Sequence, residues 1–448
     1  MMSTITALAT PPGIGGIAVI RISGDKTIEI VDQSFKTSIV QNLYGTHSVL
    51  YGKFYDEDTL LDTVLVTTFR KPNSYTGEDV IEISCHGGYL VAGEIINILI
   101  KHGAKLAEPG EFTKRAFLNG KMDLTQVEAV ADIIHSSSVQ GVHTSARQLS
   151  GEFTSRLKNL RNQLVEIAGL LELELDFADE DVELLNKDDI KGKIQSAQKY
   201  CRELADSYKS AEILRSGYFV GIVGYPNAGK SRLFNTLLKK RRAIVSEIPG
   251  TTRDYLEENM MIGGIMFRLI DTAGIRDSTN IIEIEGIKLV ESILEQSNMI
   301  LVLNDISISE SNSEKLFEEL KEKYPESYVI LVQNKIDLIT AIKKNKKWLY
   351  ISAKRGDGID MLKNVLYHNA KQSTERINDV LVNQRQANLL NQASKDLEYA
   401  MLSLDSGLTN EIIAIDIRNA AKKLGELTGE SWSEEVLNTV FGKFCIGK

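Results

Sequence analysis

A short segment with two glycines and one lysine, Gly224–Ser231, has the residue types and spacing of a site for a phosphorylated ligand. It reads GYPNAGKS and fits G-x-x-x-x-G-K-[ST], the phosphate-binding loop. An apolar, strand-like run at 218–223 precedes it, and a helical pattern begins near Arg232. In that setting backbone N–H groups and the positive end of a helix converge on phosphate oxygens. Lys230 would then reach the β- and γ-phosphates and Ser231 would ligate Mg²⁺.

Three further segments follow in the order typical of a guanine-nucleotide site. Asp271–Gly274 (DTAG) follows an apolar run, so its aspartate can hold Mg²⁺ through water and its glycine N–H can touch the γ-phosphate. Asn334–Asp337 (NKID) resembles the GTPase motif whose aspartate accepts from guanine N1–H and the 2-amino group, donors that adenine lacks. Ser352–Lys354 (SAK) resembles the last base-contacting loop. The predicted GTP contacts are Asn227, Ala228, Gly229, Lys230, Ser231, Arg232, Ser246, Ile248, Thr251, Thr252, Asp271, Thr272, Ala273, Gly274, Asn334, Lys335, Asp337, Ser352, Ala353 and Lys354.

The residue after DTAG is Ile275, which cannot orient the attacking water as the glutamine of many small GTPases does. Asn227 and the run 249–254 (PGTTRD) resemble the potassium-activated GTPases, in which K⁺ takes the place of an arginine finger. The resemblance implies K⁺ ligands and Mg²⁺ ligands, and it makes Glu283 the water-orienting residue. The implied K⁺ ligands are Asn227, Ser246, Ile248 and Thr251; the Mg²⁺ ligands are Ser231 and Thr252; the catalytic residues are Glu283, Lys230 and Thr252.

Other roles stay open for these residues. Asn227 could simply stabilise the loop, and Arg253 could act as a finger from within the chain. Glu283 also fits a solvated acid at a helix start.

The elements that must position these groups divide the 448 residues into four segments. Residues 1–118 alternate strand-like runs with glycine turns and predict a small α/β domain. Residues 119–214 and 376–448 have helical apolar spacing, whereas 215–375 alternate strand, loop and helix. We therefore expect an α/β and α multidomain protein, with a P-loop GTPase domain of mixed, mostly parallel sheet inserted into a helical domain.

Composition excludes several classes. A net charge of −9 argues against a protein held to nucleic acid by a whole-surface positive field, although a local basic groove stays open. The basic runs at 239–242 and 343–347 are more typical of solvated loops. The chain has no stretch of about 18 apolar residues, no signal-peptide pattern and only three scattered cysteines, so we predict a cytoplasmic location.

Motifs outside the nucleotide site distinguish this chain from other GTPases. The segments Thr4–Gly13, Arg21–Gly24, Ser74–Asp79, Cys85–Gly88, Glu108–Thr113, Arg115–Leu124 and Cys445–Lys448 resemble the MnmE (TrmE) family. The resemblance covers nearly the whole chain.

The resemblance implies a homodimer formed through the N-terminal domains, which bind 5-formyl- or methylene-tetrahydrofolate as a one-carbon donor. Arg21, Glu78, Lys121 and Lys448 occupy the positions of folate contacts. Cationic side chains can pair with the folate carboxylates, and a carboxylate can accept from the pterin amino edge. With a FAD-carrying partner, MnmG (GidA), in a heterotetramer, the family adds a carboxymethylaminomethyl or aminomethyl group to C5 of the wobble uridine (U34) of certain tRNAs.

One other function is compatible with the same motifs: a GTP-switched ribosome or RNA assembly factor without modification chemistry, which folate binding would distinguish. A third possibility, a membrane-surface GTPase, has no support, because the chain contains no amphipathic membrane signal and no lipidation motif. Cys445 could be a nucleophile near the pterin or could simply pack. Two residues depart from the family pattern: Ile14 replaces a basic residue, and Asn304 replaces an aspartate.

Overall fold

The computed structural model describes residues 3–38, 45, 47–176, 186–238, 256–271, 290–339, 345–374 and 380–448. The chain forms two compact units. The first contains Met1–Ala131, Gln148–Lys199 and Leu389–Lys448; the second contains Asp132–Arg147 and Tyr200–Asn388. Among the described helices, none has the length and apolar character needed to cross a membrane.

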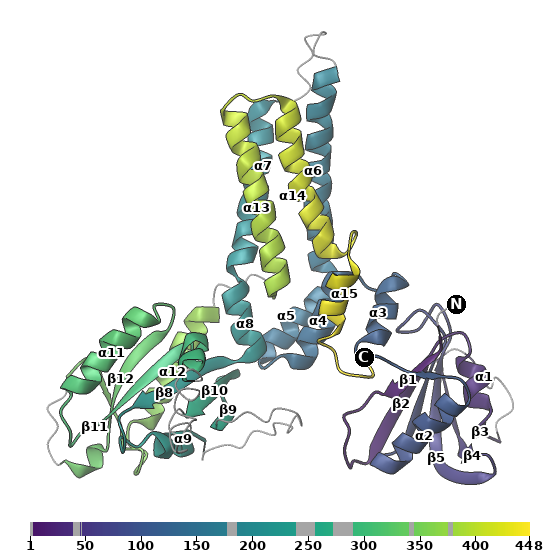
Figure 1. Ribbon diagram of the computed structural model, residues 1–448, viewed down its shortest axis with the longest axis horizontal. Coiled ribbons are helices and arrows are strands. Elements are labelled where there is room, and N and C mark those ends of the chain that lie inside the picture. The colour runs from purple at the N-terminus through teal and green to yellow at the C-terminus, as the bar shows by residue number, and fades with distance from the viewer. Residues whose placement is uncertain are drawn as a thin grey trace, which may run out of the picture. The chain divides into compact units, whose positions relative to one another are not determined.

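The first unit begins with a seven-stranded sheet in the order β3-β4-β5-β6-β2-β1-β7 (Figure 1). Neighbouring strands are antiparallel except β1 and β7, which are parallel. The elements are β1 Ile5–Leu8, β2 Ile17–Ser23, α1 Thr27–Asp32, β3 Phe35–Lys36, β4 Ser48–Asp56, β5 Thr59–Phe69, β6 Val80–His86, α2 Tyr89–Lys101, β7 Lys105–Leu106 and α3 Glu111–Leu118.

The two faces of this sheet differ because side chains alternate along each strand. One face carries Ile20, Ile22, Ile81 and Ile83, which are buried beneath α1 and α2. The opposite face carries two cross-strand rows. They are Tyr51, Leu65, Ser84, Val19 and, beside it, Val49, Thr67, Glu82, Arg21. Val49, Tyr51 and Leu65 are exposed, so an apolar region and a charged pair share this open face.

Helices make up the rest of the first unit, and α6 packs along α14 over much of its length. The apolar positions of α14, such as Ile413, Ile417 and Leu424, recur at helical spacing and are buried. Ion pairs Arg161–Glu430 and Arg418–Glu172 lie beside this contact. The helices are α4 Leu124–His135, α6 Glu152–Asp176, α7 Lys187–Asp206, α13 Gln384–Asp405, α14 Asn410–Thr428 and α15 Glu434–Phe441. Residues 132–135 of α4, 200–206 of α7 and 384–388 of α13 belong to the second unit.

The second unit is built on a six-stranded sheet in the order β13-β12-β11-β8-β10-β9, parallel except for the β9–β10 pair. Its elements are α5 Val139–Leu149 (whose last two residues belong to the first unit), α8 Tyr208–Ser216, β8 Tyr218–Gly224, α9 Lys230–Leu238, β9 Leu256–Ile262, β10 Ile265–Asp271, β11 Met299–Asp305, α11 Ser311–Lys323, β12 Tyr328–Asn334, the 3-10 turn Ile336–Leu338, β13 Trp348–Tyr350 and α12 Ile359–Thr374.

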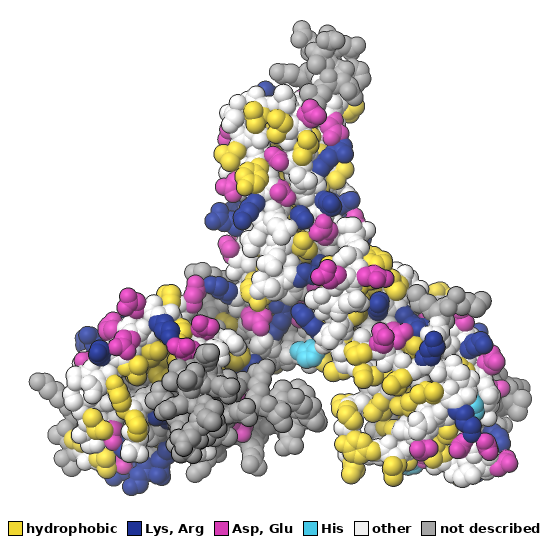
Figure 2. Space-filling model, viewed as in Figure 1, with side chains coloured by type: hydrophobic (Ala, Val, Ile, Leu, Met, Phe, Trp, Pro, Cys, Tyr) yellow, Lys and Arg dark blue, Asp and Glu magenta, His cyan; other side chains and the backbone are white. Residues whose placement is uncertain are grey.

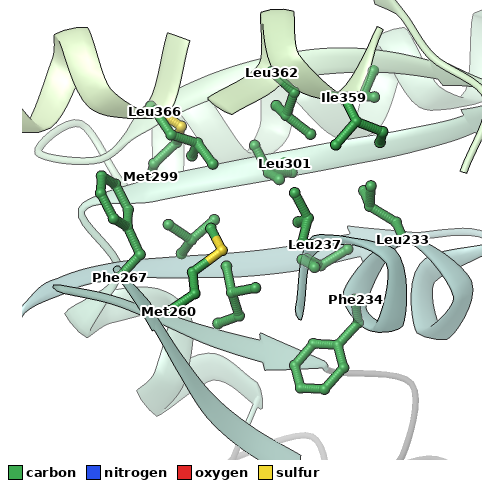
Figure 3. Packing of buried hydrophobic residues seen from close by; sticks show 14 of the residues in the cluster. Leu233, Phe234, Leu237, Met260, Phe267, Met299, Leu301, Ile359, Leu362 and Leu366 are labelled. Carbon is green, nitrogen blue, oxygen red and sulfur yellow. The ribbon is translucent and has the colours of Figure 1, made fainter. Parts of the chain in front are cut away.

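Helices cover both faces of the second sheet, and β11 is buried along its whole length. Met299 and Leu301 pack with Leu237 of α9 and Leu366 of α12 on one face (Figure 3). The next residues along β11, Ile300 and Val302, pack against α11 on the other face. A sheet covered on both sides requires continuous apolar strands, which explains the runs in the sequence. The carboxyl ends of β8, β11 and β12 meet at one edge, the usual place for a ligand in such a fold.

Arg215, at the end of α8, joins three separate segments of the second unit. Its Nε and Nη2 donate to the Asp132 carboxylate at 2.6 and 2.7 Å. Nη2 and Nη1 also donate to the carbonyls of Leu381 and Val382 at 2.6 and 2.8 Å. The side chains of Arg215 and Asp132 are only 11% and 14% exposed, so water screens the pair weakly.

We expect Arg215→Met to lower the free energy of unfolding by about 2 kcal/mol, because it removes all four hydrogen bonds from a nearly buried site. Urea titration of the full chain measures this change. The matched control is Lys209→Met, which breaks an exposed pair with Glu326 in the same unit and should change stability by less than about 0.5 kcal/mol. Equal effects of the two substitutions would contradict the prediction.

Candidate functional site

The loop between β8 and α9 has backbone angles that its sequence explains. Gly224, Asn227 and Gly229 have φ of 150°, 63° and 93°. A Cβ on Gly224 would lie 2.3 Å from the carbonyl oxygen of Leu303, so only glycine fits there. Lys230 begins α9 and donates from Nζ to the carbonyls of Gly224 and Tyr225 at 2.9 and 3.0 Å. Its ammonium group therefore lies across the loop.

The loop forms one wall of a pocket of about 860 Å³. Backbone and side chains of the loop, the first turn of α9 and Lys335 line the pocket. Its apolar wall comes from residues 290 and 294 and from Leu316 and Leu320 of α11. A pocket of this size with a helix N-terminus and a lysine is suited to a nucleotide phosphate chain.

Asn334, at the end of β12, connects the phosphate loop to the base-contacting loop. Its buried Nδ2 donates to the carbonyl of Ala228 at 2.9 Å, and its Oδ1 accepts from the backbone N–H of Ala353 at 2.9 Å. Thr236 of α9 adds a bond from its hydroxyl to the carbonyl of Ala353 at 2.7 Å. Three chain segments are thus held together by two side chains.

Asp337 is oriented by the same loop, because the hydroxyl of Ser352 donates to its Oδ1 at 2.6 Å. This hydrogen bond is the main reason why the pKa of Asp337 lies below its usual value. The group is therefore a carboxylate at neutral pH, as an acceptor for guanine N–H groups must be.

A second polar cluster lies in the first unit, around Arg21 on the open face of the seven-stranded sheet. Its Nε and Nη2 donate to Oε1 of Glu82, directly opposite on β6, at 2.9 and 2.8 Å. Its Nη1 donates to the carbonyl of Gly447 at 3.2 Å. The guanidinium carbon also lies 5.4 Å from the ring centre of Tyr75 and 5.6 Å from that of Phe112, within cation–π range.

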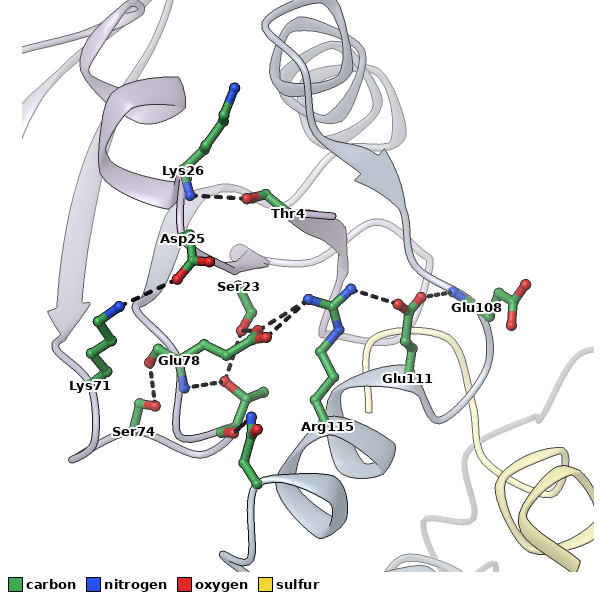
Figure 4. A network of polar contacts seen from close by, with 12 residues as sticks. Thr4, Ser23, Asp25, Lys26, Lys71, Ser74, Glu78, Glu108, Glu111 and Arg115 are labelled. Atoms are coloured by element: carbon green, nitrogen blue, oxygen red, sulfur yellow. Dashed lines mark hydrogen bonds and ion pairs between the residues drawn. The ribbon is translucent and has the colours of Figure 1, made fainter. Parts of the chain in front are cut away.

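Glu78 lies beside this cluster and is held by two donors (Figure 4). The Ser23 hydroxyl donates to Oε2 at 2.7 Å, and Nη1 of Arg115 donates to the same oxygen at 3.1 Å. Arg115 is only 4% exposed and also pairs with Glu111 at 2.8 Å. Because Ser23 is two residues from Arg21 on β2, both side chains leave the same face of the sheet.

The last residues of the chain complete the cluster. Gly447 has φ of 95°, and a Cβ there would lie 2.1 Å from the carbonyl oxygen of Leu8, so glycine permits the tail to lie against β1. Partial burial lowers the pKa of Lys448, and the nearby charge of Arg21 lowers it further. The charge of Glu82, which is paired with Arg21, opposes this shift.

Comparison with known proteins identifies the family. The family model for the GTP-binding protein TrmE N-terminus matches residues 4–121, and the model for the MnmE helical domain matches residues 124–445. A tRNA modification GTPase MnmE from Christiangramia forsetii is 40% identical over 99% of this chain and 99% of its own. Those of Flavobacterium johnsoniae and Cytophaga hutchinsonii are each 41% identical over 99% of this chain, and 99% and 98% of their own. This chain belongs to the MnmE family of tRNA modification GTPases.

Family membership confirms the predicted fold class and the prediction of GTP hydrolysis. The described part of this MnmE-family chain brings together the loop Asn227–Arg232, Asn334, Lys335, Asp337 and the stretch 352–354. Asp271 ends β10 beside Ile222 of β8, although its side chain is outside the described atoms. The remaining predicted contacts lie outside the described residues and stay predictions: Ser246, Ile248, Thr251, Thr252, Thr272, Ala273, Gly274 and Glu283.

Three of the four predicted folate residues lie in one cluster, and the fourth lies in a neighbouring loop. Arg21, Glu78 and Lys448 belong to the cluster on the MnmE-family N-terminal sheet. Lys121 is exposed and donates to the carbonyl of Pro72 at 3.1 Å, next to the loop that carries Glu78. Cys445 is exposed, and its backbone carbonyl accepts from the N–H of Gly110 at 3.4 Å.

Sequence reasoning missed the partners of these residues. Glu82 faces Arg21 only because of the β2–β6 register, and the role of Thr236 depends on how α9 packs. Arg115 lies in a segment that carried the family resemblance, but its charge alone did not indicate a buried ion pair. The available sign was two alternating strands, one with a basic residue at an outward position, Arg21, and the other with an acidic one, Glu82.

We expect Gly229→Ala to weaken GTP binding by at least about tenfold, because the new Cβ would lie 2.5 Å from Nδ2 of Asn334 and displace its amide. Fluorescent GDP titration measures the affinity. The matched control is Gly264→Ala, which has a similar positive φ, 83° against 93°, but no atom within 4 Å of the new Cβ. It should reduce stability through backbone strain of about 1–2 kcal/mol while leaving nucleotide affinity unchanged. Equal affinity losses would show that strain, rather than the contact with Asn334, is responsible.

Proposed function

We propose that this protein is a K⁺-activated GTP hydrolase that drives modification of the wobble uridine in certain tRNAs. A FAD-carrying partner of the MnmG (GidA) type would act with it in a heterotetramer and supply the redox chemistry. Together they would add a carboxymethylaminomethyl or aminomethyl group to C5 of U34, with a tetrahydrofolate as the one-carbon donor. Identity of about 40% to MnmE relatives over 99% of the chain carries this proposal.

The chain would use its nucleotide loop for both metal ions. Asn227 lines the pocket and has an amide oxygen, a suitable ligand for a hard cation such as K⁺. Ser231, in the first turn of α9, would ligate Mg²⁺ together with Thr252. The remaining K⁺ ligands would be Ser246, Ile248 and Thr251, and Glu283 would orient the attacking water. Each ion offsets phosphate charge that increases as the bond breaks.

We expect GTP hydrolysis by the purified chain to be at least about tenfold faster in KCl than in NaCl at equal ionic strength. Asn227→Ala should remove most of this difference, whereas Asn235→Ala, later on α9, should keep it. Phosphate release measures both rates. Equal rates in the two salts would exclude the potassium mechanism and favour Arg253 or a finger supplied by a partner.

The cluster around Arg21 would hold the folate. Arg21 and Lys448 present positive charge to the folate glutamate carboxylates, and Glu78 presents an acceptor to the pterin amino edge. Tyr75 adds aromatic surface beside Arg21, whereas Phe112 packs in the core below the guanidinium group. Lys121 would approach from the neighbouring loop. The domain limits that go with this assignment are 1–118 for folate binding, 215–375 for GTP, and 119–214 with 376–448 for the helices.

The open face of the N-terminal sheet would form the homodimer. Val49, Tyr51 and Leu65 are exposed there: Val49 lies in the row that leads to Glu82 and Arg21, and Tyr51 and Leu65 lie in the row beside it. Figure 2 shows hydrophobic side chains gathered on this domain, whereas positive and negative side chains are interspersed over the visible surface. Burial of this apolar region by a second copy would stabilise a dimer and would place its edge beside the folate cluster.

We expect Arg21→Met to raise the dissociation constant for 5-formyltetrahydrofolate by at least about tenfold, since it removes a charge-assisted hydrogen bond to the ligand. Calorimetric titration of the full chain measures this constant. The control is Lys101→Met, which removes a cation from α2, on the covered side of the same sheet. If the unaltered chain binds no folate at all, the assembly-factor alternative gains support and folate chemistry is excluded.

A further inference from the structure

The nucleotide pocket contains an ion pair to which neither the motifs nor the family assignment gives a role. It joins Nζ of Lys335 to Oδ2 of Asp305 at 2.7 Å. Asp305 is the last residue of β11 and lies beside Asn334 of β12 in the sheet register. Lys335 follows Asn334 directly and lines the pocket. The pair therefore lies between the residue that holds the loops together and the site of the base.

The Asp305 carboxylate is fixed by contacts on both oxygens. Oδ1 accepts from the backbone N–H and the hydroxyl of Ser307 at 3.0 and 2.7 Å, while Oδ2 accepts from Lys335. The side chain is only 7% exposed. Burial would raise its pKa, but the hydrogen bonds from Lys335 and Ser307 outweigh that effect and lower it. Asp305 is thus a rigid, charged anchor at neutral pH.

Lys335 is consequently held at both ends. Its backbone has φ of 63°, an unusual value for a residue other than glycine, and its ammonium group is bound to Asp305. Between these fixed points lies a stem of four methylene groups, and about a third of the side chain is exposed. Two residues further on, Asp337 offers its carboxylate. A planar base whose edge pairs with Asp337 would have its face next to the Lys335 stem, which is apolar.

Asn304, the neighbour of Asp305, performs a different task. Its Nδ2 donates to Oε1 of Gln333 at 3.2 Å and to the carbonyl of Asp305 at 3.1 Å. Its Oδ1 accepts from the hydroxyl of Ser313 at the start of α11. These bonds are buried and join protein to protein, whereas the carboxylate of Asp305 acts on a side chain that faces the pocket.

We propose that Asp305 is a positioning residue for guanine nucleotide binding, which acts by holding the Lys335 side chain along the face of the base. This inference rests on GTP binding in the described pocket and is independent of the potassium and folate assignments. Asp305 itself touches no nucleotide atom. Asp305 changes nucleotide affinity by way of Lys335, which contacts the base. Because GMP, GDP and GTP share the same base, their affinities should change equally.

The first test is Asp305→Asn, which keeps the size of the side chain and an oxygen for Ser307 but turns an amide N–H toward the lysine. We expect the dissociation constants of GMP, GDP and GTP to rise by the same factor, about tenfold. Displacement of a fluorescent GDP from the full chain measures all three. Constants that stay within twofold of the original, or a loss that differs between GDP and GTP, would overturn the proposal.

The second test is a double-mutant cycle with Lys335→Met, which keeps an apolar stem but removes the ammonium group. If Asp305 acts through Lys335, Asp305→Asn should cause no further loss of affinity in the Lys335→Met background. Additive losses would show that Asp305 works by another route and would refute the proposal. Because the cycle compares affinities in two backgrounds, it remains decisive even where Asp305→Asn lowers stability.

Two matched controls separate positioning from a general structural effect. Ser313→Ala removes a buried bond to Asn304, and Glu257→Gln breaks the half-buried pair with Arg268 on the β9–β10 hairpin. Both should lower the thermal unfolding midpoint while leaving nucleotide affinities unchanged. If these substitutions weaken GMP, GDP and GTP as strongly as Asp305→Asn does, the assignment of a specific role to Asp305 is wrong.

Discussion

The buried amide group of Asn334 links the two loops of the described nucleotide site. Its N–H holds the phosphate loop at Ala228 and its oxygen holds the base loop at Ala353, and these loops are far apart in the sequence. Gly229 must lack a side chain because this amide occupies the space next to it. The continuous apolar strands also contribute to the site, because their pairing places the carboxyl end of β12 near those of β11 and β8. A buried amide that both donates and accepts is rigid, and that rigidity keeps the two loops in register.

The N-terminal sheet differs from the second sheet, because one of its faces is open and carries both charged and apolar side chains. Its covered face has a conventional core beneath α1 and α2. Its open face carries the Arg21–Glu82 pair in the same cross-strand row as Val49, and the row beside it contains Tyr51 and Leu65. The chain terminus then lies against β1 and brings Lys448 to the same edge. Under the proposed function, ligand recognition and self-association share this one surface, so that each affects the other.

The sequence predicted features that depend on local backbone geometry and missed those that depend on register. Gly224, Gly229 and Lys230 could be placed because the loop motif fixes its own conformation. The fold class followed from periodicity and was confirmed. Asp305 was passed over because its role requires β11 to pair with β12 in one particular register, and Glu82 was missed for the same reason. Asn304 departs from the family pattern with no predicted catalytic consequence, and its amide makes several buried bonds that an aspartate could not all make.

Arg215 brings together the two ends of the segment that contains the six-stranded sheet. The chain leaves α8 at this residue, and it returns, after the whole six-stranded sheet and α12, to Leu381 and Val382, which bind the same guanidinium group. The two ends of the inserted sheet are therefore neighbours in space. A segment with adjacent ends can be acquired, lost or replaced by a short linker without stretching the chain that surrounds it. Such an arrangement explains in physical terms how a nucleotide-binding module can be inserted into a helical protein.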